Sequence, residues 1–276
     1  MCKYRLLISY DGTHYSGWQI QPNALSIQQK IVETAHIILK EPMHLIGSGR
    51  TDAGVHALGQ VAHFTTQQPL DIDRFVYSMN CLLPPDIRIL HGEEVDRSFH
   101  AQFSAIKKEY HYHLALGEVT SPFQRLYALS VRHRFDRKAF IEAAGYFIGT
   151  HDFTTFANAP LQGAVAKNPV RTIYRLDIID VDGGLRIEFE GNGFLYKMVR
   201  NIVGTLLDVS KGKFPSDAIP GLLACRDRRL GGRAAPPQGL FLMKVSYADR
   251  TEPHQGSEDE PLPERQNEEV QDRESL

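Results

Sequence analysis

The sequence predicts an α+β fold with two similar halves of antiparallel sheet, each flanked by helices. Strand patterns and capped amphipathic helix patterns alternate through residues 1–248. An Asp-Gly-Gly turn at 182–184 separates two long strand patterns and predicts an antiparallel hairpin. The same mixture of elements occurs twice, so we place a domain boundary at 105/106. Residues 249–276 are acidic and nearly free of aliphatic side chains, and we predict a disordered tail.

The first half, 1–105, is expected to contain two helices between its strands. The strand patterns are alternating or apolar runs at 3–10, 43–46, 61–64 and 87–90. Ser26 is expected to cap the first helix, with Gln29 completing a capping box. Asp73 is expected to cap the second helix, which ends at Pro84 and Pro85 because proline cannot continue a helix.

The second half, 106–248, repeats this alternation of strands and helices. Its strand patterns are 108–116, 170–181, 185–190 and 239–247. Its helix patterns are 136–147, 194–209 and 215–224, the first opened by Asp136 as a cap. The C-terminal half is therefore also α+β.

Charge is divided unevenly along the chain. Residues 249–276 have ten acidic residues against three arginines, a balance of −7, so the net charge of −2 leaves +5 on 1–248. A basic body suits a polyanionic partner such as a nucleic acid, although +5 is a mild excess. The three cysteines are far apart and suit a reducing cytoplasm. We expect no signal peptide, and no apolar run approaches the ~20 residues of a membrane span.

The most unusual segment is the glycine-rich stretch 47–57, between two apolar runs. It contains Arg50 and Asp52, and a cation two residues away favours the ionised carboxylate, which suits a nucleophile or a base. Alternatively, Asp52 is an ordinary turn residue that bonds its own backbone. The stretch is neither a dinucleotide fingerprint nor a phosphate loop, because it lacks the third glycine of the one and the Gly-Lys-Ser/Thr of the other.

The strand pattern 107–113 alternates with period two. Tyr110 and Tyr112 are expected on one face, and His111 and His113 on the other. Two histidines at this spacing could bind a metal, but nothing nearby in sequence supplies a third ligand, so we predict no metal site. The tyrosines either belong to the core or stack on a ligand.

The helix pattern 194–209 has an apolar stripe, and Arg200 falls at its edge. Arg200 either lays its stem along the core as a boundary residue or points to a site. Trp18, the single tryptophan, lies in a polar loop at 13–23, where it could stack on RNA or pack onto the body.

Several strings resemble the bacterial tRNA pseudouridine synthase A family. The strings are Gly-Arg-Thr-Asp-Ala-Gly-Val-His-Ala at 49–57, Tyr-Asp-Gly-Thr at 10–13, Gly-Trp-Gln-Ile-Gln at 17–21, the Lys-x-Tyr-x-Tyr strand at 108–112, Met-Val-Arg-Asn-Ile-Val-Gly at 198–204 and Ala-Pro-Pro-Gln-Gly-Leu at 235–240. The resemblance runs from Lys3 to about Ser246 and implies the pseudouridine synthase fold, with a central basic cleft between the two halves.

The resemblance also implies roles for individual residues. Asp52 is the catalytic nucleophile, and Arg50 and Arg200 complete the catalytic set, Arg200 by pairing with Asp52 across the cleft. Tyr110 packs on the target base, with Trp18 and Lys197 assigned to substrate binding. The implied reaction converts uridine to pseudouridine at positions 38, 39 and 40 of the tRNA anticodon arm. It needs no cofactor, and a cytoplasmic homodimer binds one tRNA across both subunits.

Two other classes of function remain open on the residues alone. One is a non-catalytic RNA-binding module in which Asp52 is structural. The other is a nucleoside hydrolase or glycosidase, which usually places a second carboxylate about the bond that breaks, whereas the loop at 47–57 offers Asp52 alone.

Overall fold

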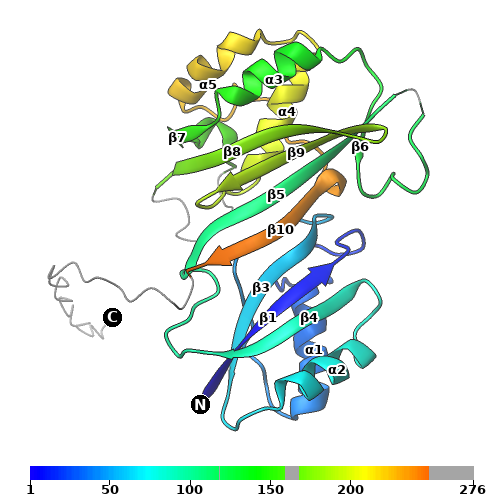
Figure 1. Ribbon diagram of the computed structural model, residues 1–276, viewed down its shortest axis with the longest axis vertical. Coiled ribbons are helices and arrows are strands. Elements are labelled where there is room, and N and C mark those ends of the chain that lie inside the picture. Colours follow the sequence, from blue (N-terminus) through cyan, green and yellow to red (C-terminus); the bar gives the residue numbers. More distant parts are fainter. Residues whose placement is uncertain (118, 159–167, 249–276) are drawn as a thin grey trace, which may run out of the picture.

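The computed structural model describes residues 1–117, 119–158 and 168–248, and the predicted tail at 249–276 lies outside the described residues. Within them the strands form one long sheet, and helices pack beside each half of it (Figure 1). The strands are β1 (Cys2–Tyr10), β2 (Ile46–Gly47), β3 (His56–Thr66), β4 (Ile87–Val95), β5 (Ala105–Leu116), β6 (Leu129–Val131), β7 (Gly149–Asp152), β8 (Val170–Val181), β9 (Gly184–Gly191) and β10 (Leu240–Tyr247).

The main path of the sheet is β4-β1-β3-β10-β5-β9-β8-β7, with β2 on β3 and β6 on β5. Neighbouring strands are antiparallel except for the β10–β3 and β5–β6 pairs, which are parallel. The last strand, β10, lies between β3 of the first half and β5 of the second. The predicted α+β class is confirmed, and the two predicted halves share a single sheet because β10 joins them.

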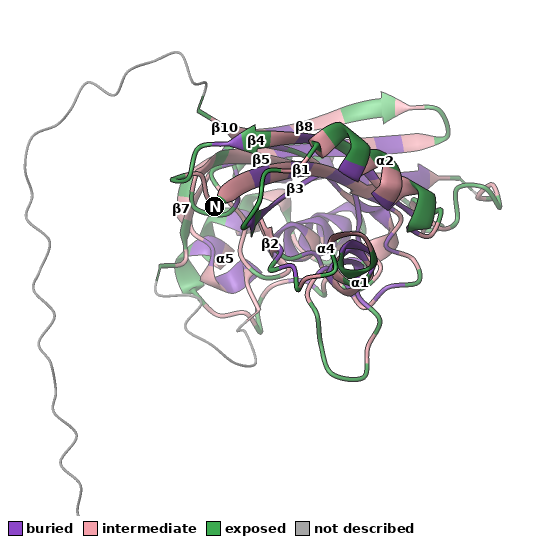
Figure 2. Cartoon of the chain, turned by 90° about the horizontal axis from the view of Figure 1, so that it is seen from below, coloured by how far each residue is buried: buried purple, intermediate pink, exposed green. Residues whose placement is uncertain are grey.

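The helices cover one side of the sheet, and Figure 2 shows α1, α4 and α5 below its strands. Their bounds are α1 (Ile27–Leu39), α2 (Ile72–Leu82), α3 (Arg137–Gly145), α4 (Met198–Ser210) and α5 (Ile219–Cys225), with short 3-10 turns at Thr154–Phe156, Ser216–Ala218 and Pro237–Gly239. No helix among the described residues has the length and apolar character to span a membrane.

Two apolar cores lie under the sheet. One packs α1 and α2 against β1 and β3, with Leu6, Ile31 and Phe64 fully buried or nearly so. The other packs α3, α4 and α5 against β5, β8 and β9 around Phe140 and Ile202. The domain boundary at 105/106 stays a proposal, since β10 adds residues of the C-terminal segment to the first core.

Several element boundaries differ from the sequence predictions. Asp71, rather than Asp73, caps α2, because its side chain accepts the backbone N–H of Arg74. The strand expected from Met43 begins only at Ile46, and the short strands β6 and β7 were not predicted. The helix expected from 194 begins at Met198, since the preceding Lys197 has a left-handed backbone with φ of 59°. The Ser26 cap is present as expected.

Candidate active site

The loop between β2 and β3 is held in place by side chains from the first core. Gln60 of β3 donates to the carbonyl of Gly49 at 3.0 Å. The hydroxyls of Tyr10 and Thr51 are hydrogen-bonded at 2.8 Å. The backbone N–H of Trp18 donates to the Thr51 carbonyl at 3.1 Å. The backbone that leads into Asp52 is thus fixed before any ligand binds, which is the preorganisation that a reacting group needs.

Asp52 forms an ion pair with Arg200 of α4, at 2.5 Å between Oδ2 and Nη1. The two side chains are 16% and 12% exposed, so the pair lies near the surface without being freely solvated. The Nε of Arg200 donates to the carbonyl of Ala235 at 2.7 Å, which fixes the guanidinium. Gly54, with φ of 75°, lets Pro237 approach, because a Cβ there would lie 2.9 Å from Pro237 Cγ. Three distant segments therefore meet at Asp52.

Tyr110 of β5 faces the same site. Burial, and to a smaller extent the negative charge of Asp52, raises the pKa of the Tyr110 hydroxyl above its ordinary value. Its ring packs edge-on against Phe194, with ring centres 5.2 Å apart. Tyr112, on the same face, is fully buried and donates to the Pro236 carbonyl at 2.8 Å, so it belongs to the core. Of the two tyrosines, Tyr110 is the one whose hydroxyl is affected by the charge of Asp52.

Arg50 does not partner Asp52. The side chain of Arg50 is exposed, and in the described part of the chain it makes no hydrogen bond or ion pair. The expectation that Arg50 holds the Asp52 carboxylate is therefore wrong, because Arg200 takes that place. Lys197, the last residue before α4, points its Nζ at the ring of Tyr196, 5.1 Å from the ring centre.

Trp18 belongs to the body of the protein. It is 1% exposed, and its indole packs against Gly47, where a Cβ would lie 2.6 Å from the indole nitrogen. The ring centre of Tyr10 is 6.0 Å away. Of the two alternatives, Trp18 packs onto the body. The alternative in which its ring stacks on RNA is wrong because the ring is covered.

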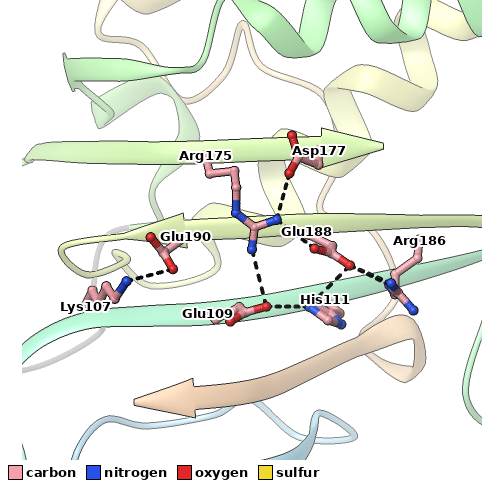
Figure 3. A network of polar contacts seen from close by, with 8 residues as sticks. All are labelled: Lys107, Glu109, His111, Arg175, Asp177, Arg186, Glu188 and Glu190. Atoms are coloured by element: carbon pink, nitrogen blue, oxygen red, sulfur yellow. Dashed lines mark hydrogen bonds and ion pairs between the residues drawn. The ribbon is translucent and has the colours of Figure 1, made fainter. Parts of the chain in front are cut away.

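The other face of β5 has a network of ion pairs with β8 and β9 (Figure 3). Glu109, His111 and Glu188 bring possible metal-binding atoms within 4.8 Å of one another, which supplies the additional ligands that the sequence near the histidines did not suggest. Both oxygens of Glu188 are already bound at 2.7 Å, one by Arg175 and one by Arg186. A cation would have to compete with two guanidinium groups, so the geometry favours an ion-pair network over a metal site.

His113 lies outside this group. Its ring centre is 6.5 Å from that of His111, and burial lowers the pKa of His113 to about 4. His111 and His113 therefore do not form a pair of ligands in this arrangement. The prediction that the protein has no metal site stays a prediction.

Three residues near Asp52 were missed by the sequence analysis: Gln60, Tyr10 and Lys108. Gln60 is fully buried, next to Val61 in β3, and a buried amide is itself a signal because it needs hydrogen-bonding partners. Lys108 donates to the carbonyl of Ser48 at 2.8 Å. Period-two alternation places Lys108 on the face of Tyr110, and this was available from the sequence.

Comparison with known proteins identifies the family. A family model described as tRNA pseudouridine synthase matches residues 6–104 and 143–248, most of the chain. The protein belongs to the tRNA pseudouridine synthase family. The match confirms the resemblance predicted from the loop at 49–57 and the helix at 198–204. It also favours an isomerase over the hydrolase and over the non-catalytic binding module.

Individual relatives agree along nearly their whole length. The chain is 59% identical over 245 residues to "tRNA pseudouridine synthase A 1" of Protochlamydia amoebophila (strain UWE25), covering 88% of this chain and 96% of the relative. It is 46% identical to the tRNA pseudouridine synthase A of Bacillus pumilus (strain SAFR-032), covering 89% and 99%. It is 47% identical to that of Chlamydia muridarum (strain MoPn / Nigg), covering 89% and 92%.

Proposed function

We propose that this protein isomerises uridine to pseudouridine in tRNA, at positions 38, 39 and 40 of the anticodon arm, with Asp52 as the reacting carboxylate. The observation on which this rests is the ion pair of Asp52 with Arg200, which joins the family strings at 49–57 and 198–204 at one point. The carboxylate is partly exposed and its partner is fixed by Ala235. A substrate can therefore reach an oriented carboxylate.

The reaction rearranges one nucleotide. The bond from ribose C1′ to uracil N1 breaks, the uracil turns, and C5 bonds to C1′ while the C5 proton is lost and N1 gains one. A single carboxylate suffices, by attacking C1′, by adding to uracil C6 or by deprotonating the sugar. No electrons enter or leave, so no redox cofactor is required.

Tyr110 supplies a surface for the target base. A uridine in a stem must first leave the stack, which costs a few kcal/mol, and base–aromatic stacking offsets about 1–3 kcal/mol of that. We assign Arg50, exposed on the loop of Asp52, to the substrate rather than to the carboxylate. Lys197 is assigned to the RNA backbone, since its partly buried ammonium has an aromatic ring and no carboxylate as its described neighbour.

We further propose a cytoplasmic homodimer that binds one tRNA across both subunits. The widely separated cysteines fit a reducing compartment. Sedimentation equilibrium of the free protein tests the dimer, and a protein that stays monomeric at micromolar concentration would contradict it.

The function is tested by incubating an unmodified tRNA transcript, with uridine at 38, 39 and 40, with the protein in the presence of a chelator. Chemical mapping of pseudouridine is expected to show conversion at these positions. Release of free uracil would indicate a hydrolase. Binding of the tRNA without conversion would indicate a binding module.

A further inference from the structure

Lys108 reaches from β5 into the loop that holds Asp52. Its Nζ donates to the Ser48 carbonyl at 2.8 Å, four residues before Asp52. Nζ passes close to the loop backbone at Gly49, where a Cβ would lie 2.9 Å from it. An ammonium has three N–H donors, so the single hydrogen bond to Ser48 leaves two for another acceptor.

The charge of Lys108 has no carboxylate partner in the part of the chain that the structure describes. Its neighbours in register are Gly191 in β9 and Val245 in β10, both uncharged. The charged group that acts on it is Arg171 of β8, another cation. Burial, together with Arg171, lowers the pKa of Lys108 to about 8.

Arg171 likewise has no carboxylate partner among the described residues. Its guanidinium donates to two backbone carbonyls, those of Asn168 at 2.9 Å and Val170 at 2.6 Å, and forms no ion pair among the described residues. Burial lowers its pKa from the ordinary value. Two partly buried cations that repel each other are unfavourable without an anion, because each also loses hydration.

The position of Lys108 connects the two cations to the loop of Asp52, where the reacting nucleotide would bind. Lys108 and Tyr110 are two residues apart on one face of β5, a separation of about 7 Å. The negative charge of Asp52 acts on the Tyr110 hydroxyl, and Ser48 leads into the Asp52 loop. An anion bound by Lys108 and Arg171 would therefore lie close to the loop that carries the carboxylate.

We propose that Lys108 and Arg171 form a binding site for a backbone phosphate of the RNA, next to the nucleotide that is isomerised. This inference rests on the proposed function. The phosphodiester supplies the missing negative charge, and its oxygens accept the free N–H groups of both side chains. The site fixes the position of the RNA strand while Tyr110 and Asp52 act on the base and sugar.

The test compares Lys108→Met with Lys107→Met. Lys107 is the adjacent residue on the opposite face and is paired with Glu190 at 3.1 Å, so its removal is a matched control for the loss of one positive charge. Affinity for tRNA is measured against salt concentration in an Asp52→Asn background, so that the RNA is not converted. Lys108→Met is expected to weaken binding about tenfold and to lower the log–log salt slope by about 0.7–0.9. Lys107→Met is expected to change neither.

A neutral phosphate identifies the contact directly. The two phosphates that flank the target uridine are replaced, one at a time, by methylphosphonate. Protein with Lys108 intact, or with Lys108→Arg, is expected to lose about tenfold in affinity for one of the two RNAs. Lys108→Met retains Arg171, so neutralising the same phosphate is expected to cost it clearly less affinity than it costs the protein with Lys108 intact.

The inference is wrong if neutralising either phosphate costs Lys108→Met as much affinity as it costs the protein with Lys108 intact. It is also wrong if the salt slope of Lys108→Met equals that of Lys107→Met. Failure of the proposed function is a separate result, since wild-type protein would then form no pseudouridine in the tRNA.

Discussion

The two faces of β5 differ in how their charges are balanced. On the face away from the helices, Lys107, Glu109 and His111 all have partners of opposite charge or hydrogen-bonding partners in β8 and β9 (Figure 3). On the face toward the helices, Lys108 donates to a carbonyl and is acted on by a second cation, and the charge of Asp52 acts on Tyr110. One face of the strand thus has its charges neutralised, and the other has a cation without a carboxylate partner among the described residues.

The comparison separates structural charges from functional ones. Ion pairs at a partly exposed surface contribute about 0–1 kcal/mol each, so the network of Figure 3 is a modest aid to strand pairing. A cation that is partly buried without an anion lowers stability, and such a cost is characteristic of binding sites. The Asp52–Arg200 pair belongs with the second group because its carboxylate is placed where a substrate can reach it.

The largest difference in turnover is expected between alanine substitutions of two arginines that each pair with an aspartate. Arg200→Ala leaves Asp52 without its partner and free to move, and turnover should fall about 100-fold or more, with a smaller effect on tRNA binding. Arg175→Ala removes the partner of Asp177 at 2.7 Å on the other face and should leave turnover near wild type. Single-turnover rates measure both. Equal rates for the two variants would show that Arg200 is a boundary residue.

Substitutions of Tyr110 test the comparison through their effect on tRNA binding. Tyr110→Ala should lose about 1–3 kcal/mol of tRNA binding, whereas Tyr110→Phe should retain it because the ring still stacks. Release of tritium from uracil C5 shows whether the hydroxyl moves the C5 proton, in which case Tyr110→Phe binds but releases tritium slowly. Tyr174→Ala, at an exposed tyrosine of β8, is the control. Wild-type binding and turnover by Tyr110→Ala would place the ring in the core.

The lowered pKa of Lys108 predicts how tRNA binding depends on pH. Since its pKa is lowered to about 8, the ammonium is present at pH 7 and is lost as the pH rises through that value. Affinity should therefore fall between pH 7 and pH 9, by about tenfold or less. Lys108→Arg should bind equally at both pH values because a guanidinium stays charged. A wild-type affinity that rises with pH over this range would contradict the assignment.

The smallest effect is expected on stability. The pKa of Lys108 is lowered from 10.5 to about 8, so between these values the unfolded state binds more protons, and stability rises with pH. At pH 7 the folded state therefore bears the whole free-energy cost of the partly buried ammonium. Lys108→Met removes this cost and should raise Tm by about 2–4 °C for each 1 kcal/mol gained in the free energy of unfolding. Calorimetry at pH 7 measures the difference from Lys107→Met. A lower Tm for Lys108→Met would show that the bond to Ser48 outweighs the unpaired charge.

Local patterns predicted the α+β class and most of the elements of this fold. The Ser26 cap, the turn at 182–184 and the strand at 108–116 depend on neighbouring residues, so the sequence was sufficient for them. The start of α4 was missed because the left-handed backbone of Lys197 interrupts a continuous helix pattern. The insertion of β10 between the halves depends on contacts between distant segments, which periodicity does not report.

The site was predictable where it lay in continuous strings. Asp52 and Arg200 stood in such strings, and the structure brings them together. Trp18 was ambiguous because an aromatic ring in a polar loop can face either way, and its burial depends on the approach of Gly47. The sequence did not distinguish Lys108 from Lys107 by type, and only the partners of each reveal their different roles.

The most direct test of the account replaces two aspartates, one in the loop before β3 and one in the ion-pair network of β8. Asp52→Asn and Asp177→Asn each keep the shape of a side chain that binds an arginine, and each removes its charge. Both variants are incubated with unmodified tRNA, and pseudouridine at positions 38, 39 and 40 is mapped alongside tRNA affinity. We expect Asp52→Asn to bind tRNA and form no pseudouridine, and Asp177→Asn to convert it as wild type does. Conversion by Asp52→Asn at more than a small fraction of the wild-type rate would contradict the assignment of Asp52 as the reacting carboxylate.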